Sequence, residues 1–260
     1  MTSSRPLGPE SWRPVETSGD VIRLAVWSGP RNISTALMRS WENRHDTVVI
    51  DEPLYPHYLK VTGLDHPGRD EVMSAGETDW RRVVAALLGP VPDGIRVLYQ
   101  KHMAHHLLPS IDRTWVSLLT NVLLIRDPRD AVASYVRSRA DVTVEDLGIH
   151  QQVQLYDELA VAGRHPPVID ARDFLLHPEA YLRAICRHVG VDFTARMLAW
   201  PPGRRRSDGV WGRYWYEAVW RSTRFAAYQP RSLRLDGPAA AVADECLPMY
   251  ERLYEARWVL

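Results

Sequence analysis

The stretch VIRLAVWSGPRNISTAL, residues 21–37, joins a short apolar run to a segment with helical spacing. The run is interrupted only by Arg23, as expected of a buried strand, and apolar residues then recur at Ile33, Ala36 and Leu37. A Gly-Pro pair between the two segments allows a tight turn. A strand that leads directly into a helix is the basic unit of a parallel α/β fold.

Further β-like runs alternate with helical patterns along the chain. The expected strands cover residues 21–28, 47–51, 96–100, 121–126 and 168–171. Helices are expected over residues 33–44, 78–88, 129–138, 143–163, 179–190 and, packing back on the sheet, 239–254. The alternation predicts an α/β fold with a central parallel sheet of about five strands flanked by helices.

Charge and composition restrict the function classes. The chain has 260 residues, and its 32 basic side chains balance its 32 acidic ones. A balanced chain has no overall field that attracts nucleic acid or a membrane surface, so an anion site has to come from a local cluster. Lys60 and Lys101 are the only lysines, so an arginine at a site carries less information here than usual.

Cysteine usage and hydropathy favour an intracellular protein. Cys186 and Cys246 show no paired or metal-like spacing, and no apolar run approaches the ~18 residues of a membrane span. Residues 1–20 lack the apolar core of a signal peptide and are expected to form a loose lead-in. We therefore expect a cytoplasmic protein with a single α/β domain over residues 21–260.

The turn after the first expected strand has the composition of a phosphate-binding loop. The helix that follows a parallel strand presents unpaired N–H groups and the positive end of its dipole. Gly29 allows close approach of a ligand, and Arg31 has a guanidinium that binds anion oxygens in pairs. The turn lacks the lysine and second glycine of the triphosphatase loop G-x-x-x-x-G-K-[ST]. The anion-binding candidates are Gly29, Arg31, Asn32, Ser34 and Thr35, with a simple helix cap at Asn32 or Ser34 as the alternative.

The same turn, SGPRNIST, resembles the 5′-phosphosulfate loop of the sulfotransferases that use 3′-phosphoadenosine 5′-phosphosulfate (PAPS), whose typical form is P-[KR]-S-G-[ST]-T. The resemblance gives Arg31 the place of the family's catalytic basic residue. It gives Ser34 and Thr35 the places of the hydroxyl donors. Asn32 stands where serine is usual and β-branched Ile33 where glycine is usual, so a somewhat different loop shape is expected.

A second stretch, LLIRDPRDAVASY, resembles the family's 3′-phosphate motif R-[ND]-P-[KR]-D-x-x-x-S. Arg126 ends an expected strand, Pro128 suits the first position of the next helix, and Ser134 lies farther along it. The resemblance implies that Arg126 and Ser134 bind the 3′-phosphate of the donor. From the residues alone, Arg126 could instead pair with a neighbouring aspartate and Ser134 could be an ordinary helix residue.

Two segments are expected to surround the site. Residues 201–236 combine the basic stretch GRRRSDGVW with a helix-like aromatic segment, in the region where the family often has a basic loop over the 3′-phosphate. Arg205 and Arg206 are the candidates there, with a solvated loop as the alternative. Residues 54–77 are expected to form a lid or a pocket wall.

The resemblance implies a P-loop NTPase-like three-layer fold and transfer of a sulfuryl group from PAPS to a hydroxyl or amine of a small-molecule acceptor. The sulfuryl group carries less charge than a phosphoryl group, so no metal is expected, although His102, His105 and His106 could be imagined as metal ligands.

The reaction needs a base. Glu52, after the second strand, resembles the glutamate base of some family members and is the first candidate. His102 is the second, near where cytosolic members carry Lys-Thr-His, with Lys101 matching their lysine.

Two other functions remain open at this point. A kinase or other nucleoside-phosphate transferase would need Mg²⁺ and the missing loop lysine. A degenerate relative would bind a nucleotide without turnover, and Ile33 in the loop together with Ala171, where the family has a tyrosine, motivates that alternative.

Overall fold

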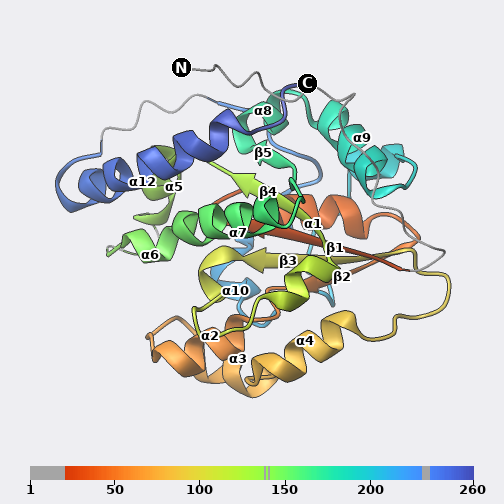
Figure 1. The fold of residues 1–260 in the computed structure, drawn as a ribbon, viewed down its shortest axis with the longest axis horizontal. Coiled ribbons are helices and arrows are strands. Elements are labelled where there is room, and N and C mark those ends of the chain that lie inside the picture. Colours follow the sequence, from red (N-terminus) through yellow and green to blue (C-terminus); the bar gives the residue numbers. More distant parts are fainter. Residues whose placement is uncertain (1–20, 138, 140, 230–234) are drawn as a thin grey trace.

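The computed structural model describes residues 21–137, 139, 141–229 and 235–260. Its centre is a five-stranded sheet in the order β2-β3-β1-β4-β5, and every neighbouring pair is parallel. The strands are β1 (Ile22–Ser28), β2 (Thr47–Asp51), β3 (Val97–Met103), β4 (Thr120–Ile125) and β5 (Val168–Asp170). In Figure 1 the sheet runs from β2, low in the view, to β5 near the top. Each strand overlaps a predicted one, so the predicted α/β fold is confirmed.

The helices follow the predicted pattern with local differences. The longer ones are α1 (Ser34–Glu42), α4 (Trp80–Leu88), α5 (Pro128–Tyr135), α7 (Ile149–Val161), α9 (Pro178–Val189) and α12 (Gly237–Glu255). The shorter ones are α2 (Tyr55–Thr62), α3 (Arg69–Ala75), α6 (Val144–Leu147), α8 (Ala171–Leu176), α10 (Gly212–Trp215) and α11 (Glu217–Arg221). The predicted helix over 143–163 is two helices, because Gly148 takes a left-handed φ of 66° that ends α6 before α7 begins.

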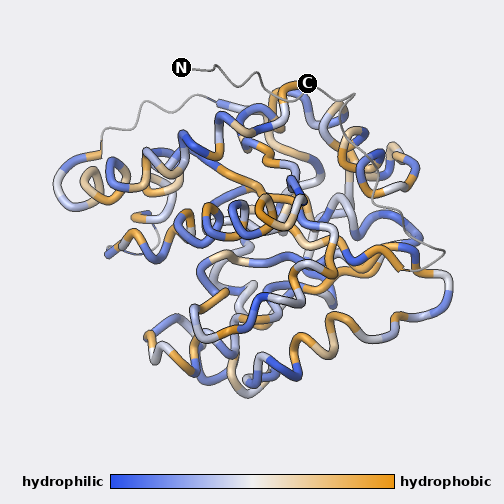
Figure 2. Tube along the Cα trace, viewed as in Figure 1, coloured by the Kyte–Doolittle hydropathy of each residue, from blue (hydrophilic) through white to orange (hydrophobic). Residues whose placement is uncertain are grey.

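The side chains of β1 alternate between two hydrophobic layers. Ile22, Leu24 and Val26 pack against α1, α8 and α9, whereas Ala25 and Trp27 pack against α4 and α7. Helices therefore cover both faces of the sheet, which explains why its strands are near-continuous apolar runs. Figure 2 shows the orange of the central strand between helices that alternate blue and orange.

The terminal helix α12 returns to the sheet, as predicted. Its buried residues Cys246, Tyr250 and Leu253 pack with side chains of β4, β5 and α5. The Tyr250 hydroxyl donates to Asp170 Oδ2 at the end of β5 over 3.0 Å. Figure 1 shows α12 beside α5 at the opposite side of the sheet from α2, α3 and α4.

All strands end at the same edge of the sheet, and the connections that follow them meet there. Beyond this edge, Tyr55, Tyr58 and Leu59 of α2 pack on Trp211 and Tyr216. The two segments predicted to surround the site are therefore in contact with each other. Residues 1–20 and 230–234, the predicted lead-in and part of the predicted closing segment, lie outside the described residues. Within the described part of the chain no helix is long and apolar enough to cross a membrane.

Gly29 provides a test of the packing behind the turn. A Cβ at this position would lie 2.3 Å from the carbonyl oxygen of Leu147 at the end of α6. We expect Gly29→Ala to lower the free energy of unfolding by about 1–3 kcal/mol, because it overpacks this contact. Urea unfolding measures the change. The control Val161→Ala, at a side chain that is 90% exposed, should shift stability by no more than about 0.5 kcal/mol. Equal stability of the two variants would contradict the close contact.

Candidate active site

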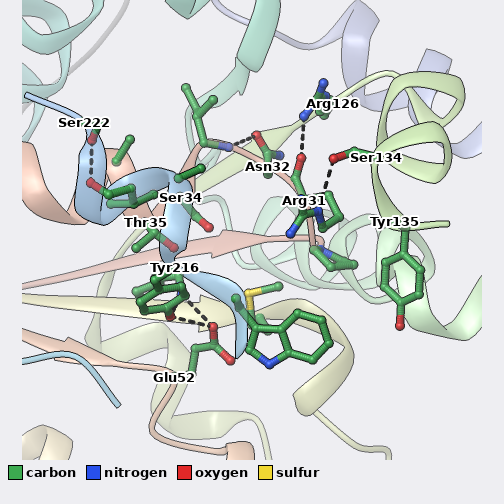
Figure 3. A pocket seen from close by; sticks show the side chains of 18 of the residues that line it. Arg31, Asn32, Ser34, Thr35, Glu52, Arg126, Ser134, Tyr135, Tyr216 and Ser222 are labelled. Atoms are coloured by element: carbon green, nitrogen blue, oxygen red, sulfur yellow. Dashed lines mark hydrogen bonds and ion pairs between the residues drawn. The ribbon is translucent and has the colours of Figure 1, made fainter. Parts of the chain in front are cut away.

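A pocket of about 350 Å³ lies at the carboxyl edge of the sheet. Its wall combines residues of the turn after β1, the ends of β2 and β3, helix α5 and the segment 215–226. The predicted site residues that line it are Arg31, Asn32, Ser34, Thr35, Glu52, Arg126 and Ser134. Figure 3 shows these side chains around one cavity.

The two predicted phosphate motifs meet in this wall. Arg31 Nε donates to Ser134 Oγ over 3.1 Å, although the residues are 103 positions apart. Arg126 donates to the carbonyl oxygen of Arg31, and these dashed contacts are visible in Figure 3. Asn32 ties the turn to the sheet, since its amide nitrogen donates to Leu124 O over 3.0 Å. Arginine and hydroxyl groups from both motifs thus face a common space.

The start of helix α1 adds hydrogen-bond donors to the same wall. Its first bonded amide is that of Leu37, which donates to Ile33 O over 2.9 Å. The amides of Ser34, Thr35 and Ala36 donate to no described residue. No acidic side chain occupies the first turn of α1, and no side chain caps it. The positive end of the helix dipole therefore remains free to attract an anion. Neither of the predicted helix caps forms.

Glu52 belongs to a buried cluster of polar side chains. Lys101 Nζ donates to Glu52 Oε1 over 2.6 Å and to Asp51 Oδ1 over 2.9 Å. The Tyr216 hydroxyl lies 2.6 Å from the same ammonium and 3.1 Å from Glu52 Oε1. Trp211 Nε1 donates to this hydroxyl over 3.1 Å. We call Asp51, Glu52, Lys101 and Tyr216 the carboxylate cluster.

The backbone explains how two consecutive carboxylates reach one ammonium. Side chains of neighbouring strand residues point to opposite faces. Glu52 has φ 41°, and this left-handed conformation ends the alternation directly after Asp51. Arg31 is the other described non-glycine residue with positive φ, at 56°. Such backbone strain of about 1–3 kcal/mol per residue is characteristic of functional sites.

Burial and neighbouring charges act on the carboxylate cluster. Burial raises the pKa of Glu52, the Lys101 ammonium opposes this shift, and the charge of Asp51 adds to it. Burial alone would lower the pKa of Lys101, but the two carboxylates raise it, so the ammonium stays charged. Glu52 Oε1 is occupied by Lys101 and Tyr216, whereas Oε2 bonds to no described residue. The residue lines the pocket and therefore offers its second oxygen to a ligand.

His102 does not reach this pocket. Its side chain points to the other face of β3 from Lys101, in keeping with strand alternation. The imidazole stacks on Trp27 with ring centroids 4.1 Å apart, and its Nε2 lies 3.1 Å from Gln100 Oε1. Burial lowers the pKa of His102 to about 3. The structure gives this second base candidate no contact with the site.

Three predicted donor-site residues lie elsewhere. Gly29 faces α6 behind the turn and does not line the main pocket. Arg205 Nη1 pairs with Glu42 over 2.7 Å, which holds it away from the pocket, and Arg206 is exposed. Among the described residues of the segment 201–236, the arginine that lines the pocket is Arg224. Sequence reasoning missed it because the chain is so rich in arginine.

The pocket has a further wall whose residues were not among the predicted site residues, although Tyr55 and His66 lie in the segment 54–77 that was predicted as a lid or pocket wall. We call Tyr55, His66, His105, His106 and Arg139 the histidine wall; all five line the pocket. The Tyr55 hydroxyl lies 2.8 Å from His66 Nδ1, and the Tyr55 and His106 rings stack with centroids 4.7 Å apart. Burial lowers the pKa of His66 to about 4 and that of His105 to about 3, so these imidazoles are neutral at neutral pH.

Among the described residues no group of three or more His, Cys, Asp or Glu side chains is arranged to hold a metal ion. The three histidines considered as metal ligands, His102, His105 and His106, do not face one common space. His102 faces the core on one side of β3, whereas His105 and His106 line the pocket from the 3₁₀ turn Ala104–His106.

Comparison with known proteins places the chain in a family. The sulfotransferase domain family matches residues 22–255. The chain belongs to this family. Two curated relatives from Arabidopsis thaliana are the branched-chain-amino-acid aminotransferase-like proteins 2 and 1, which are 35% and 36% identical over 231 and 230 residues. These matches cover 88% and 87% of this chain but only 41% and 40% of the relatives. The chain thus spans about two fifths of their length.

Solved sulfotransferase structures share the fold. The sulfotransferase domain of the Synechococcus PCC 7002 olefin synthase has a TM-score of 0.55 and 18% identity, and the match covers 95% of this chain and 98% of that one. A sulfotransferase from Alicyclobacillus acidocaldarius has a TM-score of 0.52 and 13% identity, with 92% and 98% covered. These structures confirm the predicted fold, and the match to the family over residues 22–255 confirms the predicted family.

Lys101 is the residue on which the carboxylate cluster depends. We expect Lys101→Met to lower the free energy of unfolding by about 3–5 kcal/mol at neutral pH, because two buried carboxylates lose their counter-charge. Since the pKa of Glu52 is raised in the folded state, stability falls as the pH rises through that pKa. The destabilisation should therefore shrink as the pH is lowered.

Urea unfolding of this variant and the wild type over a pH series measures the effect. The other lysine gives a matched control. Lys60 is exposed and donates to Thr78 Oγ1 over 3.1 Å, so Lys60→Met should change stability by no more than about 0.5 kcal/mol. A loss in Lys101→Met that does not depend on pH would contradict the role assigned to the ammonium.

Proposed function

We propose that this protein is a PAPS-dependent sulfotransferase that transfers a sulfuryl group to a hydroxyl of a small-molecule acceptor. The observation that carries the proposal is the contact between Arg31 and Ser134. It brings together the two motifs that resemble the 5′-phosphosulfate and 3′-phosphate sites, at the carboxyl edge where parallel sheets bind ligands. Membership of the sulfotransferase domain family supports the same activity.

The residues present fit a nucleotide with two separate anionic groups. Arg31, the hydroxyls of Ser34 and Thr35 and the free amides of α1 would hold the 5′-phosphosulfate. Arg126 and Ser134 would hold the 3′-phosphate. All these donors come from the turn after β1 and from β4 with α5, so the donor binds at rigid elements of the fold.

Glu52 is placed to act as the base. When bound, the donor supplies the sulfuryl group and a phosphate leaving group. The acceptor oxygen forms the new bond to sulfur, the bond from sulfur to the leaving phosphate breaks, and the hydroxyl proton passes to Glu52 Oε2. Lys101 and Tyr216 hold the other carboxylate oxygen, which fixes the orientation of the base. Burial raises the pKa of Glu52 toward the working pH, and this improves proton transfer.

The first acceptors to test follow from the relatives. The names of the Arabidopsis proteins refer to branched-chain-amino-acid aminotransferases. We therefore propose hydroxy compounds derived from branched-chain amino acids as the first panel. A location in the cytoplasm remains part of the same proposal.

Donor binding is tested by calorimetry with 3′-phosphoadenosine 5′-phosphate without metal, beside ATP with Mg²⁺. We expect metal-independent binding of the bisphosphate, and Arg126→Ala should weaken it about 100-fold by removing charge-assisted hydrogen bonds. Arg205→Ala is the matched control, because Arg205 pairs with Glu42 outside the pocket and its loss should leave affinity unchanged. Preference of the wild type for ATP with Mg²⁺ would favour a kinase instead.

The base is tested by turnover. We expect Glu52→Gln to lower kcat by roughly 10²–10⁴-fold with unchanged affinity for the bisphosphate. The wild-type rate should rise with pH through the raised pKa of Glu52, above the usual range of a glutamate. His102→Gln should keep full activity, because its ring faces the core. Full turnover in Glu52→Gln together with loss in His102→Gln would reverse the assignment.

A further inference from the structure

Buried polar atoms without a partner gather on one side of the pocket. Among the described residues they include Arg139 Nη1, His66 Nε2, His105 Nδ1 and His106 Nδ1. All four residues belong to the histidine wall. The donor side shows no such side-chain atoms among the described residues. A buried polar group normally has a partner, and a polar ligand at the histidine wall would supply one after small side-chain movements.

Arg139 supplies the positive charge of this wall. Its side chain hydrogen-bonds to that of Tyr135, and among the described residues it forms no ion pair with a carboxylate. Asp146 also acts on Tyr58 and His66 with its negative charge, but it forms no ion pair with Arg139 and accepts a hydrogen bond from Thr143 N over 2.9 Å at the start of α6. The neighbouring histidines are neutral because they are buried. The Lys101 ammonium is neutralised by Asp51 and Glu52.

The base and this arginine line the same pocket, and so does Tyr55. The charges of Glu52 and Arg139 both act on the phenol of Tyr55. Because Glu52 and Arg139 both line this pocket, a small molecule on the histidine wall can contact a carboxylate base and a guanidinium at once. The guanidinium fork matches a carboxylate in geometry and charge. A dianionic phosphate would need more than one cation as its partner, and the Glu52 carboxylate would repel its second charge.

We infer that the acceptor is a small hydroxy acid, whose hydroxyl is directed to Glu52 and whose carboxylate binds Arg139. The inference rests on the proposed function and narrows its acceptor class. The carboxylate takes no part in the transfer. It fixes the molecule so that the hydroxyl oxygen faces the sulfur of the donor, and the histidines of the wall bond to other polar atoms of the acceptor.

The test uses the full chain saturated with 3′-phosphoadenosine 5′-phosphate. The probes are short aliphatic 2-hydroxy and 3-hydroxy acids, the neutral amide of each acid, and the corresponding phosphate monoesters, titrated by calorimetry. We expect at least one acid to bind about tenfold or more tightly than its amide, because the amide loses a charge-assisted pair. The acid that binds should also be sulfated when PAPS replaces the bisphosphate.

Variants assign the contact to one side chain. Arg139→Gln should remove the preference for the acid over the amide and raise KM for the acid, with unchanged affinity for the bisphosphate. Arg137→Gln is the matched control, because Arg137 lies on the same segment, is exposed and does not line the pocket. It should retain both affinities.

The outcomes separate the two proposals. A wild type that does not bind the bisphosphate contradicts the proposed function. A wild type that binds the bisphosphate but prefers no acid over its amide, or prefers the phosphate monoesters, overturns the hydroxy-acid inference alone. If Arg139→Gln loses the bisphosphate and keeps the acid preference, Arg139 belongs to the donor site and the inference is wrong.

Discussion

The Lys101 ammonium joins three separate parts of the chain at the floor of the pocket. It bonds to the carboxylates at the end of β2 and to the Tyr216 hydroxyl, while its own residue belongs to β3. With only 1% of its side chain exposed, this charge stays buried only because well-placed partners compensate for the lost hydration. The position of Glu52 and that of the segment around Tyr216 therefore depend on one amino group.

Backbone strain at the pocket depends on the same kind of support. Arg31 and Glu52 both have positive φ, a conformation that persists only where the surroundings enforce it. The Arg31 carbonyl accepts a hydrogen bond from Arg126, and the Glu52 amide donates to Lys101 O over 2.9 Å. The two side chains proposed to act in the reaction are thus aimed by backbone geometry that neighbouring strands hold in place.

Much of this arrangement could be predicted from local sequence. Apolar runs bounded by turns predicted the strands. These runs are nearly continuous because helices cover both faces of the sheet. The two motifs predicted that Arg31 and Ser134 lie in one site. Strand alternation was also present in the sequence. It separates Lys101 from His102, and applying it would have excluded His102 from the pocket.

The remaining features depend on contacts between residues far apart in the sequence. Arg205 is held outside the pocket by Glu42, and no local pattern relates the two. The positive φ of Glu52 could not be predicted either, since glycine is the residue expected there. The histidine wall combines α2 and the segment after it with the turn after β3 and the segment after α5, so its residues become neighbours only through the fold.

Helix α5 connects the two sides of the pocket. Ser134 bonds to Arg31 on the donor side, and the next residue, Tyr135, lies within the field of Arg139. The Arg139 amide donates to Tyr135 O over 3.1 Å, which continues the helical hydrogen bonding beyond α5. A shift of α5 would therefore move the proposed 3′-phosphate and carboxylate contacts together. The residues proposed to bind the donor lie on elements next to the sheet, whereas the histidine wall lies on connections outside it. Substitutions in that wall can therefore change the proposed acceptor without disturbing the proposed donor site.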